Sequence, residues 1–407
     1  MEWIMTSQKA RLVLIVLASI MAIRMLGLFM ILPVFSASAT QFLHATPGLI
    51  GLALGMYGLT QALFQIPFGM LSDKIGRKPV ILIGLTLLLI GSVIAARAHT
   101  IHILLLGRAL QGAGAIGSTV LALTADLTRD ESRSKAMALM GLSIGLAFTV
   151  ALIVGPVLNG LFGLSGIFWA TCILAVIAIL LLITIIPKPS NIPANTLHES
   201  IQKRFKIILQ DPDLLRLNFG IFALHAILTA MFLVLPLILL QKIKLTEWHQ
   251  VSLYLSVLFV SFLLALPLII ISEKKKLTKP IFLNAIVAII VIQMLLIWFH
   301  SSLLSITILL LIFFTAFTFL EATLPSLISK IAPAHLKGTA MGIYSSSQFF
   351  GIFVGGAVGG WVLTYADFPG VFLLCTCIGM IWLSTTFFMK PELRKSAGTG
   401  SLPEVEN

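Results

Sequence analysis

The chain has 407 residues, of which 58% are hydrophobic and 10% are charged, and its mean hydropathy is +1.07. A soluble domain is about 25% charged, so this composition excludes a water-soluble protein and predicts that lipid covers much of the surface. The net charge of +12 could suggest nucleic-acid binding. The basic residues, however, lie in short segments between apolar runs, which is typical of a membrane protein.

Apolar runs recur along the chain, and each is long enough to cross a bilayer, which takes about 20 residues. The first run is too long for the apolar core of a signal peptide and has no clear small-residue cleavage site after it. Twelve membrane-spanning helices are therefore expected. Their predicted ranges are 12–34, 47–71, 79–97, 101–126, 135–161, 165–186, 213–240, 249–272, 278–299, 302–330, 337–363 and 369–389.

Lysine and arginine are unevenly divided between the two sides of these spans. With the N-terminus in the cytoplasm, 22 of the 27 lie on the cytoplasmic side, three on the other side and two inside spans. Cytoplasmic loops carry the excess of basic residues. We therefore expect an all-α, multi-pass protein of a bacterial inner membrane with both termini in the cytoplasm.

The two halves of the chain resemble each other. Ala136-Met137 matches Ala340-Met341, and Pro67 matches Pro267, at nearly the same offset. A long polar stretch with several prolines lies between the halves and is expected to be a linker. The predicted domains are a six-helix bundle at 1–186, a cytoplasmic linker at 187–212, a second six-helix bundle at 213–390 and a disordered cytoplasmic tail at 391–407. Such parallel repeats build many secondary transporters.

The segment after the second span carries a specific motif made of Gly69, Asp73, Gly76, Arg77 and Lys78. Gly69 would allow another helix to approach closely, and Gly76 permits a tight turn. Asp73 is a lone carboxylate at a membrane boundary, which suits a helix N-terminus. The two basic residues could also be ordinary cytoplasmic charge, although this does not explain the complete set.

This motif resembles motif A of the major facilitator superfamily. The resemblance implies the twelve-helix fold of that family. It also implies that Asp73 contacts the start of the eleventh span near Lys337, which would lock the cytoplasmic side in the outward-open state. Arg77 is implied to pair with Asp126 at the end of the fourth span.

Two other segments are similar to motifs of the same family. Span four, with Arg108 and Gln111, is similar to motif B, which is linked to proton coupling. Span five is similar to motif C of proton-driven antiporters, although Ala151 stands where that pattern has glycine. The matching positions of span five are Gly155, Pro156 and Gly160.

Among the drug:proton antiporters, the chain most resembles the YajR-like branch. The resemblance rests on segments such as Tyr57–Gln61 and Leu324–Lys330 and covers nearly the whole membrane part. Members of that branch carry a further soluble domain at the C-terminus. This chain is expected to lack it.

Four ionisable residues lie well inside predicted spans: Arg24, Arg108, His225 and Glu321. A charge near the bilayer centre costs about 2.5–3.5 kcal/mol, so each is a candidate functional residue. In the fold that the resemblance implies, their spans line the central cavity. Glu321 could carry protons or anchor the substrate, or it could be a structural carboxylate that a neighbouring helix satisfies.

The other three have similar alternatives. His225 could relay protons or act as an ordinary hydrogen-bonding group. Arg24 could hold a substrate carboxylate, tune an acid or be a paired structural cation, and Arg108 could function in motif B or extend towards the outer surface. Further polar side chains could line the cavity or join helices: Tyr57, Gln61, Gln65, Gln111, Tyr344 and Gln348.

These features favour a proton-coupled secondary transporter that exports small, amphipathic molecules or drugs by alternating access. A facilitator or proton symporter for sugars or metabolites is the alternative, and a non-transporting receptor or scaffold is a third. No nucleotide-binding loop and no metal or catalytic constellation is visible, so neither an enzyme nor ATP coupling is expected. We expect a monomer in the lipid bilayer that binds a small molecule and protons, with no nucleic acid and no cofactor beyond the proton gradient.

Overall fold

The computed structural model describes residues 7–128, 130–187, 201–275, 277–333 and 336–389. These residues form helices joined by short connections, with one isolated bridge between Leu43 and Thr100. Parts of the predicted linker (188–200) and the predicted tail (391–407) lie outside the described residues. Within the linker range, residues Ile201–Gln210 form a helix, α8, that the sequence did not predict.

The described chain crosses the bundle twelve times, as predicted. Ten helices are long and apolar enough to span a membrane. Two of them, α7 (Asp130–Thr184) and α13 (Lys337–Phe387), each contain two spans. The chain reverses direction between the spans at Gly163 and at Asp367, where φ is 67° and 53°. The other elements are α1 (Ser7–Phe29), α2 (Phe35–Ser38), η1 (Ala39–Gln41), α3 (Pro47–Ile75), α4 (Arg77–Ala96), α5 (Ile101–Ala113), α6 (Gly117–Asp126), α9 (Pro212–Gln241), α10 (Glu247–Lys274), α11 (Thr278–Phe299) and α12 (Leu303–Ile331).

Local sequence signals explain several helix boundaries. The Thr46 hydroxyl accepts a hydrogen bond from the backbone N–H of Leu49 at 3.3 Å, and a proline follows it at the start of α3. Asp211 caps α9 in the same way. Gly76 has φ of 96° and separates α3 from α4, a conformation that glycine adopts at no steric cost.

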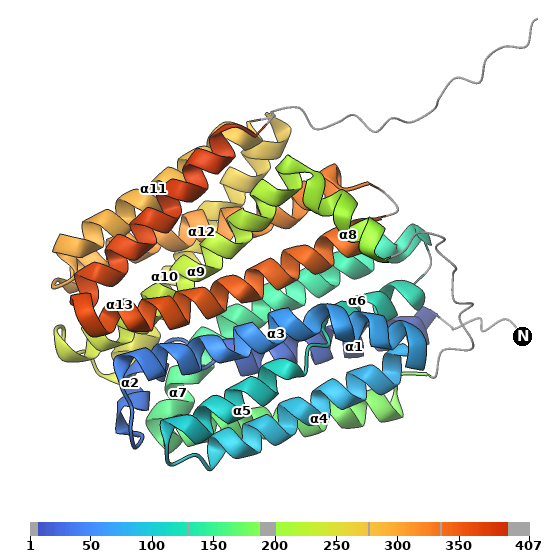
Figure 1. The fold of residues 1–407 in the computed structure, drawn as a ribbon, viewed down its shortest axis with the longest axis horizontal. Helices are drawn as coiled ribbons and strands as arrows, with labels where there is room; N and C mark the ends of the chain where they lie inside the picture. The colour runs from blue at the N-terminus through green and yellow to red at the C-terminus, as the bar shows by residue number, and fades with distance from the viewer. Residues whose placement is uncertain (1–6, 129, 188–200, 276, 334–335, 390–407) are drawn as a thin grey trace, which may run out of the picture.

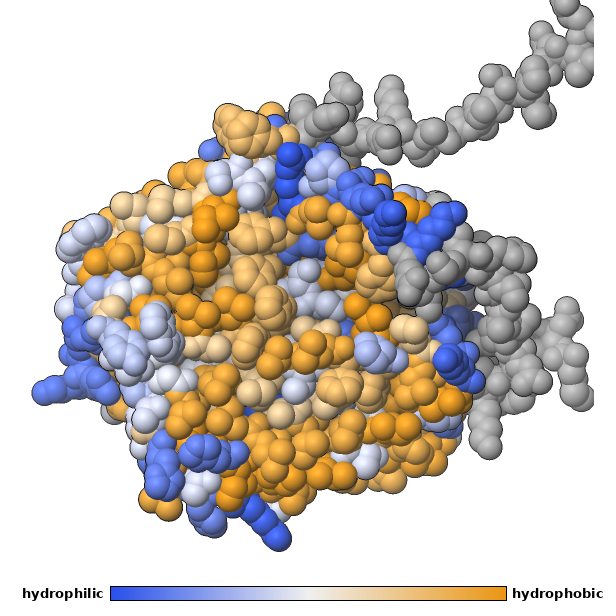
Figure 2. All heavy atoms as spheres, in the orientation of Figure 1, coloured by the Kyte–Doolittle hydropathy of each residue, from blue (hydrophilic) through white to orange (hydrophobic). Residues whose placement is uncertain are grey.

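Helices α1–α7 form one group, which lies in the lower part of Figure 1. Helices α9–α13 form the other group, which lies in the upper part. The surface between the two ends of the helix bundle is apolar. An orange band of hydrophobic residues crosses the face shown in Figure 2, and blue hydrophilic residues lie at the ends of the bundle. Large apolar side chains such as Leu63, Phe162, Phe259 and Trp361 are between 61% and 67% exposed. Lipid tails would cover these side chains, as the composition predicts.

The two helix groups touch where α3 runs along the first half of α13 (Figure 1). Near the Pro47 end, a Cβ on Gly51 would collide with the carbonyl oxygen of Gly356, and a Cβ on Gly55 would lie 2.7 Å from that of Phe353. Only glycine allows backbones to approach this closely. This end of the molecule is therefore closed by direct backbone packing.

The predicted cytoplasmic end is different. A Cβ on Gly338 or Gly342 of α13 would meet nothing within 4 Å, and one on Gly69 of α3 would meet only the Ser118 hydroxyl at 3.5 Å. Helices α3 and α13 thus separate towards this end. The structure is closed at the Pro47 end and open at the predicted cytoplasmic end.

The glycine contact predicts a difference between two neighbouring substitutions. Gly51→Ala should destabilise this closed contact by about 1–3 kcal/mol, because the methyl group overpacks a backbone contact. Gly48→Ala is the matched control, since its Cβ would make only ordinary contacts, with the Thr364 hydroxyl at 3.6 Å and the Gly360 carbonyl oxygen at 4.0 Å. Unfolding of the purified proteins and alkylation of a cysteine introduced at Thr364 measure the effect. Equal stability and equal alkylation of the two variants would contradict this role of Gly51.

Candidate functional site

Three of the predicted polar residues meet between α9, α12 and α13. The Gln348 amide nitrogen lies 2.9 Å from Nε2 of His225 and 3.4 Å from Oε1 of Glu321. Nε2 of His225 also lies 3.9 Å from Oε2 of Glu321. The structure therefore joins a carboxylate, an imidazole and an amide from three helices into one cluster, the acid–histidine cluster.

This cluster keeps unused hydrogen-bonding capacity. The His225 side chain is 2% exposed and that of Glu321 is 35% exposed. Among the described residues, Oε2 of Glu321 and the nearby hydroxyl of Tyr344 are buried without a hydrogen-bond partner. Buried polar groups are normally paired, so these atoms are free to bind a proton, water or ligand.

Arg108 is fully buried, so the prediction that it could extend to the outer surface is wrong. Its Nη1 donates to Oε1 of Gln111 at 2.7 Å, and its guanidinium lies 4.9 Å from the centre of the Tyr57 ring. Gln111 in turn donates to the hydroxyl of Ser92 on α4 at 2.8 Å. Gln111 thus joins α5 to α4 and orients Arg108, and no sequence pattern indicates Ser92 as its partner.

Arg24 on α1 is also buried, at 1% exposure, and lies 5.7 Å from the centre of the Phe349 ring of α13. Beside it on α3, Gln61 donates to Oε1 of Gln65 at 2.7 Å. The backbone carbonyl of Gln65 accepts a bond from the Ser118 hydroxyl of α6 at 3.2 Å. The Gln61–Gln65 bond thus lies within α3, and the Ser118 bond joins α3 to α6.

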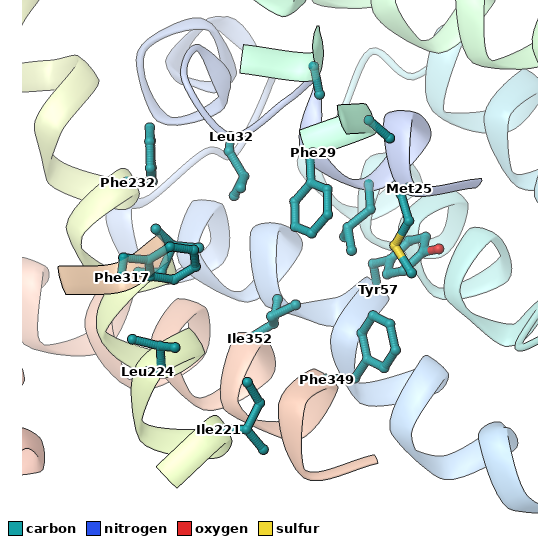
Figure 3. Packing of buried hydrophobic residues seen from close by; sticks show 14 of the residues in the cluster. Met25, Phe29, Leu32, Tyr57, Ile221, Leu224, Phe232, Phe317, Phe349 and Ile352 are labelled. Carbon is teal, nitrogen blue, oxygen red and sulfur yellow. The ribbon is translucent and has the colours of Figure 1, made fainter. Parts of the chain in front are cut away.

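Arg108 and His225 line one small cavity between the two helix groups, with room for about one water molecule. The other side chains that line it are mostly apolar, and Phe29, Leu32 and Ile352 among them are seen in Figure 3. An aromatic series crosses the interface between the groups: the Phe29 and Phe148 rings are 4.9 Å apart, and those of Phe148 and Phe317 are 5.9 Å apart. Arg24 and Arg108 thus lie on the first helix group, and the acid–histidine cluster lies on the second.

The motif A residues form an ion-pair network. Arg77 pairs with Asp73 and with Asp126, the latter at 3.2 Å, and donates to the Ser72 hydroxyl at 2.6 Å. Lys78 donates to the carbonyl of Ile186 at 2.5 Å, near the end of α7. The structure thus contains the implied Arg77–Asp126 pair and gives Lys78 a partner that the sequence did not indicate.

The implied contact between Asp73 and the start of α13 is not made in this structure. The Asp73 side chain is 62% exposed, and Gly338 has open space around it. The reason is the separation of α3 and α13 at this end.

The motif C-like residues pack α7 against the end of α1. A Cβ on Gly155 would collide with the Met30 carbonyl oxygen, so this position needs glycine. Pro156 lies inside α7 and is buried, whereas Gly160 is exposed. Asn159 accepts a hydrogen bond from Ser38 at 3.0 Å.

Comparison with known proteins agrees with this architecture. Residues 17–356 match the profile of the Major Facilitator Superfamily. The chain belongs to this superfamily. It is 43% identical over 374 residues to the inner membrane transport protein YajR of Escherichia coli (strain K12), covering 92% of this chain and 82% of that protein.

More distant relatives share parts of the chain or only the fold. The tetracycline resistance protein of class E from Escherichia coli is 33% identical over 141 residues, or 34% of each chain. The solved structure of a D-xylose-proton symporter covers 94% of this chain and 98% of its own, with a TM-score of 0.71 and 14% identity. That likeness shows the fold.

These findings confirm a secondary transporter of the superfamily, an all-helical twelve-span fold and a multi-pass location in the inner membrane. They also confirm that the chain is not an enzyme.

The exposure of Asp73 predicts the effect of Asp73→Asn. We expect the stability of the conformation seen here to change by at most about 1 kcal/mol, because the Arg77–Asp73 pair is exposed. The transport cycle should be slower, because the opposite conformation loses its lock. Asp126→Asn is the comparison variant, since it removes the other ion pair of Arg77 and leaves Asp73 in place. Transport with the kinetics of the unmodified protein in Asp73→Asn would reject the lock.

Proposed function

We propose that this transporter exports small amphipathic molecules and that inward movement of protons drives the export. The acid–histidine cluster is the observation that carries this proposal. Glu321 is the one carboxylate found deep within a spanning helix in the described part of the chain. Its free Oε2 faces an imidazole, which is a suitable pair for holding and passing on a proton.

A proton on this cluster changes the interaction that holds three helices together. The Gln348 amide donates to Nε2 of His225 and to an ionised Glu321, whereas a protonated Glu321 loses its negative charge and can donate a hydrogen bond itself. Because Gln348 belongs to α13, which packs against α3 of the other helix group, proton occupancy can bias the arrangement of the two groups. Coupling of this kind needs a proton site on a two-state element.

The relatives and the interface between the two helix groups support an amphipathic cargo. Part of the chain is similar to tetracycline resistance proteins, and export is one way in which a membrane protein can confer resistance. The interface between the helix groups is rich in aromatic side chains, including Phe29, Phe317 and Phe349 (Figure 3). Aromatic and apolar linings with a few polar groups are typical of small-molecule sites.

The test is Glu321→Gln in proteoliposomes. Ethidium, tetracycline and 4-phenylbutyrate are first screened by thermal shift, and stabilising compounds are assayed for transport with and without a pH gradient. We expect the unmodified protein to accumulate its substrate only with the gradient. Glu321→Gln should abolish this accumulation, because the amide cannot exchange a proton, yet retain exchange of substrate for substrate.

Glu273→Gln is the matched control, because this acid lies at the end of α10 and pairs with Lys330 at 3.6 Å. It should keep gradient-driven transport. Full proton coupling in Glu321→Gln would reject the assignment of the proton to this residue. Exchange without any response to the gradient in the unmodified protein would instead indicate a facilitator, and accumulation in the direction of the proton flow would indicate a symporter.

A further inference from the structure

Arg24 holds a buried positive charge that nothing in the described chain neutralises. Its side chain is 1% exposed, and none of its three guanidinium nitrogens has a hydrogen-bond partner. The described ion pairs within 4.0 Å do not include it. Arginine remains protonated in proteins, so a full charge is enclosed here without an acceptor.

The amide of Gln65 and the start of α6 provide further hydrogen-bond donors beside Arg24. Nη1 of Arg24 lies 2.9 Å, and the amide nitrogen of Gln65 3.4 Å, from the position that a Cβ would take on Gly117. The Gln65 oxygen is already bonded to Gln61, which leaves its NH₂ group as the free end. Gly117 is the first residue of α6, a ten-residue helix without a side-chain cap.

The start of α6 adds positive potential to this donor set. The first N–H groups of a helix have no acceptor within the helix and carry a partial positive charge. A cation beside such a terminus is repelled by it. The guanidinium, the amide and the helix terminus therefore all lack a hydrogen-bond acceptor, and an oxyanion would supply it. Arginine binds carboxylate and phosphate in a bidentate manner, and helix N-termini bind the same groups.

The surroundings of this donor set, which we call the Arg24 site, are apolar and aromatic. Phe349 of α13 stacks on the guanidinium from the opposite helix group. Met25 and Tyr57 lie close by in the same region (Figure 3). The site is thus covered in this conformation by a ring of the other helix group, and it opens when the two groups move apart.

We propose that the cargo is an amphipathic organic anion, whose acid group binds Arg24, Gln65 and the N-terminus of α6 and whose apolar part lies against Phe349. This assignment rests on the proposed transport function and names its substrate class. Arg108 is a weaker candidate for the acid group because Gln111 already binds it.

Equilibrium binding to the full chain in phosphatidylcholine nanodiscs tests the assignment. The probes are 4-phenylbutyrate, its amide 4-phenylbutanamide, its amine analogue 4-phenylbutylamine, and two further anions, decanoate and phenyl phosphate. We expect at least one acid to bind, and 4-phenylbutyrate to bind at least about tenfold more tightly than its amide or amine analogue. A charge-assisted bond contributes a factor of this size.

The variants separate charge from shape. Arg24→Gln should weaken anion binding at least about tenfold, and Arg24→Lys should weaken it less because the charge remains. Gly117→Ala keeps every charge but places a methyl group 2.9 Å from the position of Nη1, so it should also weaken binding. Arg97→Gln is the matched control: this arginine is exposed and lies 5.9 Å from the Trp169 ring, and its loss should leave binding unchanged.

The proposal is overturned if no acid binds more tightly than its neutral or cationic analogue, or if Arg24→Gln and Gly117→Ala bind anions as the unmodified protein does. It is also overturned if phosphatidylglycerol nanodiscs abolish binding in an Arg24-dependent way, since a lipid headgroup would then occupy the site. If Arg24→Gln does not fold, the proposal is tested by anion binding to Gly117→Ala and by comparing the acid with its amide and amine analogues. Binding requires neither turnover nor a pH gradient, so a failure of proton antiport leaves this result intact.

Discussion

The structure depends on shielding a few ionisable groups from lipid. Arg24, Arg108, His225 and Glu321 lie in spanning helices, where a lipid-facing charge is strongly disfavoured. All four side chains are turned inwards: three are at most 2% exposed, and Glu321 lies beside His225 and Gln348. Twelve apolar helices provide this shield, and the unpaired atoms left inside it are the groups that we propose to bind protons and cargo.

The alternating access that we propose would use the way in which the two helix groups meet. Backbone contact through Gly51 and Gly55 closes one end, while the ends of α3 and α13 that carry Asp73 and Gly338 are apart. The motif A ion pairs of Arg77 lie entirely within the first helix group, so they do not depend on contact between the two groups. Contact at one end and separation at the other would allow two discrete arrangements, which coupling between two sites requires.

The spans could be predicted from the sequence because each is a long apolar run, and motif A could be recognised from its spacing. The pairing of Arg77 with Asp126 came with that resemblance. What could not be predicted depends on contacts between distant segments: the break between α5 and α6, the Gln111–Ser92 bond and the burial of Arg108. Glycines near residue 114 permit a break but do not require one. The lack of any partner for Arg24 is also a property of the packed structure.

We propose that the two ends of the molecule open in turn. Electron spin resonance distances between labels at Ile75 and Lys337, and between labels at Leu43 and Tyr365, measure the two ends after replacement of the native cysteines. In lipid nanodiscs at acidic and alkaline pH, we expect two populations in which one distance is long when the other is short. Distances that change in the same direction, or that never leave the arrangement seen here, would contradict the account.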